Sequence, residues 1–251
     1  MAKRTKRLTS PNEDKVEVRI NKFLSEAGVC SRREADKAIE AGLVEIDGVK
    51  AVIGDKVTKD NMVTFKKEPV KREEKLALIA FNKPIGIVCT TDRREPNNIV
   101  DYINYGMRIY PIGRLDKDSE GLILLTNDGN IVNKILRAEF NHEKEYIVKV
   151  NKEITTDFVK KMSSGVPILD TVTKPCQIFV EDNYTFRIIL TQGLNRQIRR
   201  MCEQLDYKVI NLKRIRIMNI NLGRLKTGGF RNITEKEIET MNENMTTGKK
   251  R

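Results

Sequence analysis

The chain has 251 residues, enough for one large domain or two modest ones that each bury a core. Its formal net charge of +12, with 33% charged residues, indicates a polyanionic partner, either nucleic acid or an anionic membrane surface. Apolar runs such as 76–81 are far shorter than the roughly 20 residues of a membrane-spanning helix, which argues against the membrane.

The cysteines and the histidine give no sign of a metal centre. The 4 cysteines are scattered without a C-x-x-C pair, and the chain has 1 histidine, so we expect no metal site. We expect the cysteines to be small buried apolar residues, and His142 to be an ordinary polar residue. Scattered cysteines and a basic N-terminus without an apolar stretch favour a reducing, cytoplasmic compartment.

Residues 1–17 are rich in basic and polar side chains, so we expect a disordered basic arm. Residues 18–66 predict a small α+β module. Apolar residues recur at helical spacing from Ile20 to a stop at Gly28, and the capping box Ser31–Glu34 begins a second helix. Two strands are expected to follow, at 44–46 and 62–65.

Basic residues lie on the polar side of these two predicted helices: Arg19, Lys22, Arg32, Arg33 and Lys37. A basic helix face is often merely solvated. Two adjacent arginines in a first helical turn, however, lie where free backbone N–H groups also attract phosphate. We therefore treat the set as candidate RNA contacts that would supply affinity but little sequence choice.

Residues 67–75 are mostly charged and contain Pro69, so we predict a linker there. We predict a second domain at 76–243 and a basic tail at 244–251. Within the second domain, apolar patterns predict strands at 76–81, 108–112, 122–126, 142–150, 176–180, 185–191 and 213–220. Helices are predicted at 99–103, 131–136, 158–165, 195–205 and from the capping box at 234–237.

The most polar feature of the second domain is the loop between the strands at 108–112 and 122–126. It places five charged residues within seven positions at the edge of a buried strand: Arg114, Asp116, Lys117, Asp118 and Glu120. A charged loop is usually a solvated turn. The amino-acid sequence of this loop is more specific than that of an ordinary solvated turn.

Gly113-Arg114-Leu115-Asp116, followed by Ser-Glu-Gly-Leu-Ile-Leu-Leu-Thr-Asn, resembles the catalytic motif of pseudouridine synthases. Within that family it is most similar to the branch that modifies ribosomal RNA and carries an S4-type RNA-binding domain. The resemblance extends over about 18–241. It implies an α+β fold with an S4-like domain, a linker and a catalytic domain built on a mainly antiparallel sheet with flanking helices.

The resemblance also assigns roles. Asp116 would be the nucleophile, a carboxylate that needs neither a metal nor a histidine. Tyr146 would stack on the target uracil, and its hydroxyl is a candidate for removing the C5 proton. Arg199 would form the ion pair with Asp116. Arg114 would fill the space left by the extruded base.

Further residues complete the predicted site. Leu115 and Ile198 would line the pocket, and Lys83 would lie in a Lys-Pro turn at its rim and contact RNA. The predicted helix 195–205, with Asn195 as its cap, also carries Arg196 and Arg200. Three arginines within 196–200 repel one another, so we expect anions nearby and list Arg196 and Arg200 as RNA contacts. No cofactor is implied, because the reaction is an isomerisation.

The expected substrate is a uridine of 23S rRNA, with a tRNA anticodon uridine as the candidate second target, and we expect a monomer. The alternatives are a uridine of 16S rRNA or another 23S uridine, and a non-catalytic S4-type RNA-binding or ribosome-assembly protein. A glycoside hydrolase is a third alternative. It would need a second carboxylate such as Asp118 or Glu120, and the basic surroundings suit RNA better.

Overall fold

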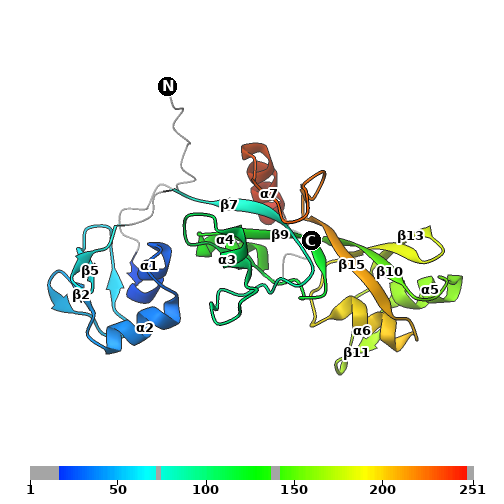
Figure 1. Ribbon diagram of the computed structural model, residues 1–251, viewed down its shortest axis with the longest axis horizontal. Helices are drawn as coiled ribbons and strands as arrows, with labels where there is room; N and C mark the ends of the chain where they lie inside the picture. Colours follow the sequence, from blue (N-terminus) through cyan, green and yellow to red (C-terminus); the bar gives the residue numbers. More distant parts are fainter. Residues whose placement is uncertain (1–16, 72–74, 137–141, 248–251) are drawn as a thin grey trace. The chain divides into compact units, whose positions relative to one another are not determined.

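The computed structural model describes residues 17–71, 75–136 and 142–247 (Figure 1). The chain divides into two compact units, Met1–Lys75 and Leu76–Arg251. The predicted disordered arm therefore lies outside the described residues except for its last position.

The first unit packs two helices on a small sheet. Helices α1 (Ile20–Glu26) and α2 (Arg32–Glu40) bury their apolar faces in one cluster, together with Val44 and Val63 of the sheet. The sheet has the order β3-β2-β5-β6, and a separate pair joins β1 to β4. The strand bounds are β1 Val18–Arg19, β2 Val44–Ile46, β3 Val49–Lys50, β4 Lys56–Val57, β5 Val63–Phe65 and β6 Glu68–Pro69.

The capping box that was predicted to begin the second helix is confirmed. The Ser31 backbone N–H donates to Glu34 Oε2 at 2.7 Å, and the Glu34 N–H donates to Ser31 Oγ at 3.2 Å. These bonds satisfy two of the backbone donors that a helix N-terminus leaves without a partner inside the helix. The local sequence therefore fixes where α2 begins.

The predicted linker is wrong in its first half. Lys66 and Lys67 form a turn with φ values of 52° and 69°, and β6 then pairs with β5. The Val70 N–H donates to the Val63 carbonyl at 2.9 Å. The charged composition suggested a linker, but these residues form a short edge strand. Polar residues are tolerated there because one side of the strand faces solvent.

The second unit is built on a long sheet of order β13-β14-β10-β15-β9-β7-β17, with β8 beside β9 and β16 beside β15. Strand β15 pairs with β9 in parallel, and the other strand pairs described in this sheet are antiparallel, as predicted. The strands are β7 Leu78–Lys83, β8 Tyr110–Ile112, β9 Glu120–Thr126, β10 Lys144–Val150, β11 Pro167–Ile168, β12 Thr171–Val172, β13 Gln177–Asp182, β14 Thr185–Leu190, β15 Val209–Ile217, β16 Ile220–Asn221 and β17 Phe230–Asn232. The helices are α3 Ile99–Ile103, α4 Gly129–Leu136, α5 Thr156–Ser164, α6 Gln197–Gln204 and α7 Glu235–Thr247.

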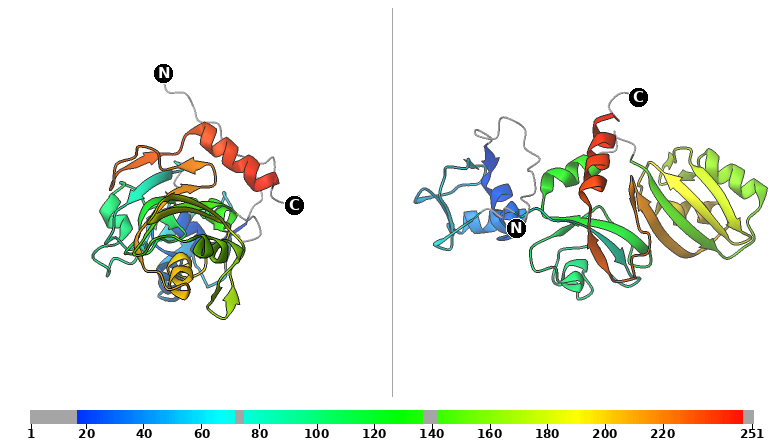
Figure 2. Two further views of the ribbon diagram at one scale, coloured as in Figure 1. Left: turned by 90° about the vertical axis from the view of Figure 1, so that its right-hand side faces the viewer. Right: turned by 90° about the horizontal axis from the view of Figure 1, so that it is seen from above.

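Alternation along β7 and β9 sends side chains into two cores. Leu78 and Ala80 join the core with α4 and α7, whereas Ile79 and Phe81 join the core with α3. A third core packs α5 and α6 on β10, β14 and β15, and Tyr146 contacts both this core and the α3 core. Helices α6 and α7 therefore cover opposite faces of the sheet (Figure 2).

Two predicted boundaries in this unit need correction. Helix α7 continues to Thr247, so the first residues of the predicted basic tail are helical. Asn195 does not cap α6. The helix begins after Arg196, which has left-handed φ and ψ values of 49° and 36° and makes no side-chain cap. Asn195 instead accepts hydrogen bonds from Arg200, at 3.1 and 3.2 Å.

Candidate active site

The loop between β8 and β9 is held in place by its own backbone and by the Lys-Pro turn. The Ser119 N–H donates to the Asp116 carbonyl at 3.1 Å, which closes a turn around Lys117. The Gly86 N–H, in the Lys-Pro turn, donates to the Lys117 carbonyl at 2.7 Å. Because the backbone of this loop is anchored on both sides, its carboxylates are presented by a defined framework rather than a free turn.

Gly121 follows this loop at the start of β9, with φ at +105°. A Cβ atom here would overlap the backbone of Arg214, the residue opposite it in the parallel β15–β9 pair. Only glycine combines this φ with so close a backbone approach. The requirement fixes the loop against β15.

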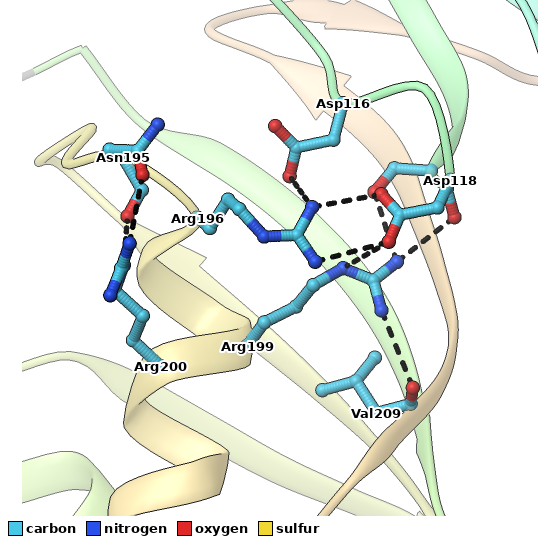
Figure 3. A network of polar contacts seen from close by, with 8 residues as sticks. Asp116, Asp118, Asn195, Arg196, Arg199, Arg200 and Val209 are labelled. Carbon is cyan, nitrogen blue, oxygen red and sulfur yellow. Dashed lines mark hydrogen bonds and ion pairs between the residues drawn. The ribbon is translucent and has the colours of Figure 1, made fainter.

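Two arginines of the α6 region clamp the two aspartates of the loop (Figure 3). Arg196 places Nη1 at 3.6 Å from Asp116 Oδ2 and Nη2 at 3.1 Å from Asp118 Oδ2. Arg199 places Nε at 3.4 Å from Asp118 Oδ2 and donates through Nη2 to the Asp118 carbonyl at 2.9 Å. Two further bonds join Arg199 to Ser119 Oγ, at 3.3 Å, and to the Val209 carbonyl, at 3.3 Å.

These contacts set the charge state of Asp118. Burial by itself raises the pKa of Asp118, but the hydrogen bond from Arg196 and the charges of Arg199 and Arg196 outweigh it, so the pKa is lowered. The same bond with Asp118 raises the pKa of Arg196. Both shifts favour the charged forms of Asp118 and Arg196.

The predicted ion pair between Arg199 and Asp116 differs from the one in the structure. Arg199 is 8% exposed, and its nitrogens are committed to Asp118, Ser119 and the β15 carbonyl of Val209. The Asp116 carboxylate pairs instead with Arg196, which lies one turn earlier. The sequence did not identify Asp118 and Ser119 as the partners of Arg199; it offered Asp118 only as a candidate second carboxylate.

The predicted pocket residues lie in neighbouring cores. Leu115 is 7% exposed in the α3 core, and Ile198 is 4% exposed in the α6 core. Tyr146 of β10 packs against both cores, so it lies where the two predicted pocket walls meet. The Arg214 guanidinium carbon lies 5.9 Å from the centroid of its ring.

Sequence comparison decides the family. The RNA pseudouridylate synthase family matches residues 77–204, and the S4 domain matches residues 18–63. The chain is 54% identical over 223 residues to the dual-specificity RNA pseudouridine synthase RluF of Escherichia coli (strain K12), covering 88% of this chain and 77% of that protein. The chain belongs to the RNA pseudouridylate synthase family. It is thus an isomerase with an N-terminal S4 domain.

Two other relatives agree with this assignment. The ribosomal large subunit pseudouridine synthase B of Bacillus subtilis (strain 168) is 33% identical over 232 residues, covering 89% of this chain and 95% of that protein. A crystal structure of a pseudouridylate synthase superposes with a TM-score of 0.66 at 29% identity, covering 89% of this chain and 99% of the other. The two-part architecture is therefore shared along most of the chain.

Lys83 of the synthase domain, predicted to contact RNA, has no exposed surface in the structure. Its side chain is completely buried, and Nζ donates to the carbonyls of Pro84 and Ile87, each at 2.8 Å. Burial lowers the pKa of Lys83, and Asp116 and Asp118 offset part of that effect. The residue shapes the Lys-Pro turn that supports the loop.

The other predicted contacts of this domain differ in how available they are. Arg114 is exposed on the loop, two residues before Asp116. Arg200 turns away from the aspartates and bonds to Asn195 (Figure 3). Of the three arginines at 196–200, two therefore serve the carboxylates, and the third holds the start of its own helix.

The basic residues of the S4 domain are presented to solvent. Arg32, Arg33 and Lys37 are exposed on α2. Arg19 is exposed too, but it belongs to β1 and precedes α1, rather than lying on a helix face as predicted. Lys22 is partly buried and lies 3.4 Å from Glu26.

The remaining titratable side chains add no metal site. In the described ranges, no group of three or more His, Cys, Asp or Glu residues is arranged to hold a metal ion. His142 is 8% exposed, with Nε2 at 3.3 Å from the Lys134 carbonyl, and burial lowers its pKa. Cys89 and Cys202 are buried as predicted, whereas Cys30 and Cys176 are only half-buried.

Among the helices that the structure describes, none is both long and apolar enough to cross a membrane.

Proposed function

We propose that this synthase isomerises a uridine of 23S rRNA, with Asp116 as the residue that acts on the ribose. The observation that carries the proposal is the Asp116 carboxylate itself. Its side chain is 34% exposed at the tip of an anchored loop, and a guanidinium lies 3.6 Å away. Asp118 is less suited to attack because Arg196 and Arg199 both engage it.

The proposed reaction moves one bond of the nucleoside. The N1–C1′ bond breaks, the uracil turns, and a C5–C1′ bond forms; C5 then loses its proton and N1 takes one up, so the product is an isomer of the substrate. In this proposal Asp116 acts at the ribose, Tyr146 stacks on the uracil, and the Tyr146 hydroxyl is the candidate group that takes the C5 proton. The uracil would lie between the walls formed by Leu115 and Ile198.

The arginines of the site have separate proposed tasks. Arg196 is the charge partner of Asp116, and Arg199 holds the loop through Asp118. Arg114 fills the stack from which the target base is extruded, a step that costs a few kcal/mol. No cofactor takes part, because the reaction has no net redox change and no group donor.

The substrate proposal rests on the relatives and on the charge of the chain. One relative is named for the large ribosomal subunit, and another is named a dual-specificity enzyme. We infer 23S rRNA as the first target and a tRNA anticodon uridine as the second, in the cytoplasm. Arg19, Lys22, Arg32, Arg33 and Lys37 would contact phosphates. Such contacts position the RNA without selecting the base.

The test incubates the full chain with 23S rRNA, 16S rRNA and tRNA from a strain that lacks such enzymes, and then maps pseudouridine chemically. We expect new pseudouridine at one 23S position with the wild-type protein and none with Asp116→Asn. Modification confined to 16S rRNA would overturn the target. Equal modification by both proteins would overturn the role of Asp116.

A further inference from the structure

Arg214 of β15 contacts both the Asp116 loop and Tyr146, yet it has no part in the reaction described so far. It is 4% exposed. Its Nε donates to the Leu122 carbonyl at 2.6 Å, and Nη1 donates to the Arg114 carbonyl at 3.4 Å. Its guanidinium carbon lies 5.9 Å from the Tyr146 ring centroid. One guanidinium therefore lies between the two parts of the proposed site.

The last nitrogen of this guanidinium, Nη2, is buried and makes no hydrogen bond within the described part of the chain. A buried donor without an acceptor costs about 1 to 3 kcal/mol, and more when the group is charged. Such groups are rare in native structures and call for a reason. The cost is consistent with a donor that is held ready for a ligand.

Two lysines, Lys144 and Lys83, lie close enough to Arg214 for its charge to lower their pKa values, although Asp116 and Asp118 act in the opposite direction on Lys83. Burial lowers the pKa of Lys144, and the charge of Arg214 lowers it further. The pKa of Lys83 is likewise lowered first by burial and also by Arg214. Like charges at this depth disfavour one another. An oxygen acceptor beside Nη2 would accept a hydrogen bond from a charged donor.

The hydrogen bonds by which the guanidinium braces the loop use Nε and Nη1 and do not involve Nη2. The backbone of Arg214 is already fixed by its parallel pairing with Gly121, where no side chain fits.

We propose that Arg214 is a further substrate-binding residue, which donates a hydrogen bond from Nη2 to a carbonyl oxygen of the target uracil. The inference rests on the proposed function, because it requires the uracil to stack on Tyr146. Since the guanidinium carbon lies over that ring, 5.9 Å from its centroid, the Nη2–H group is close enough to the ring to reach the edge of a base that stacks there. The acceptor is O2 or O4.

The test uses single-turnover pseudouridine formation on an RNA fragment that contains the mapped target uridine. The same fragment is prepared with 2-thiouridine or 4-thiouridine at that position, because sulfur accepts hydrogen bonds poorly. Wild type, Arg214→Met and Arg214→Lys are compared at saturating RNA. Lys208→Met serves as the control for a lost cation, since Lys208 is exposed just before β15.

We expect Arg214→Met to slow the reaction roughly 10- to 100-fold, the size of a lost hydrogen bond from a charged donor. We expect Arg214→Lys to recover part of the rate and Lys208→Met to match wild type. One of the two sulfur substitutions should slow wild type about tenfold and add nothing to the defect of Arg214→Met.

Three results would overturn the inference. These are wild-type rates for Arg214→Met, no sulfur effect in wild type, and equal sulfur effects in wild type and Arg214→Met. The last would leave Arg214 a structural brace. Thermal unfolding of each variant separates a folding defect from a binding defect, and Arg214→Lys carries the test if Arg214→Met does not fold. If wild type modifies no RNA at all, the proposed function fails instead, which is a distinct outcome.

Discussion

Exposed arginines of the S4 domain and buried arginines of the synthase domain differ in what they contact. Arg32 and Arg33 are exposed on α2, whereas Arg199 and Arg214 are 8% and 4% exposed and bond to backbone carbonyls. An exposed guanidinium supplies long-range attraction that salt weakens. A buried one holds a defined geometry and is costly to leave unpaired. We therefore propose that different arginines serve RNA affinity and the chemistry.

Among the substitutions that test this comparison, Gly121→Ala is expected to lower stability and activity most. The new methyl group would meet the Arg214 backbone at a φ of +105°, so the loop and β15 must separate. We expect a loss of about 3 kcal/mol in unfolding free energy, together with most of the activity. Denaturant unfolding measures it, with Gly54→Ala as the control, because that glycine has φ at +100° but no atoms within 4 Å of its Cβ position. Equal losses for both variants would show that φ alone matters.

The next effect is expected from Arg199→Met. The change removes the donors to Val209 and Asp118 and leaves buried acceptors without partners. We expect a loss of about 2 to 3 kcal/mol in unfolding free energy and a lower rate at saturating RNA. Arg200→Met is the matched control from the same helix, since Arg200 bonds only near its own helix start. A normal rate for Arg199→Met would contradict the proposal that Arg199 holds the loop in its active position through Asp118.

The exposed arginines should behave differently. We expect the double variant Arg32→Ala, Arg33→Ala to bind 23S rRNA roughly tenfold more weakly, with its salt slope reduced by about 1.5. The rate at saturating RNA should stay unchanged. Lys56→Ala is the control, because Lys56 is already 3.0 Å from Glu17. An unchanged salt slope in the double variant would remove the S4 arginines from the RNA interface.

The smallest effect concerns a third kind of arginine, one that is half-buried and paired. The bond from Arg231 lowers the pKa of Glu237 from its usual 4.5 to about 2, and Glu237 also completes the capping box of α7 with Thr234. Because the folded pKa lies below the unfolded one, this stabilisation is present above about pH 4.5 and is lost as pH falls toward 2. We expect Glu237→Gln to cost about 1 kcal/mol at pH 7 and little near pH 2. A cost independent of pH would contradict the ion pair.

Much of the fold could be predicted because local patterns carry it. The apolar spacing from Ile20 and the Ser31–Glu34 box fix α1 and α2, and the apolar run after Gly121 becomes β9. The predictions that failed concern segments whose structure depends on residues elsewhere in the chain. Strand β6 forms because β5 offers an edge, and no residue near Glu68 signals it.

The site shows the same division between local and long-range information. Leu115, Asp116, Tyr146 and Ile198 could be selected from the resemblance and from strand and helix patterns. The pairing of arginines with aspartates could not be predicted from the sequence. Arg196 and Asp118 are 78 positions apart, and Arg196 takes a left-handed backbone at the helix start. Lys83 was misjudged because lysine is almost never fully buried. Two backbone carbonyls accept from its ammonium group and permit it here.

The most direct measurement compares Asp116→Asn with Asp118→Asn in single-turnover pseudouridine formation at saturating RNA. Both changes remove one carboxylate charge from the same loop and keep its shape. If Asp116 acts on the ribose and Asp118 only anchors the arginines, Asp116→Asn loses activity by at least about 1,000-fold. Asp118→Asn then keeps measurable turnover but unfolds more easily. An inactive, fully folded Asp118→Asn beside an active Asp116→Asn would contradict the account.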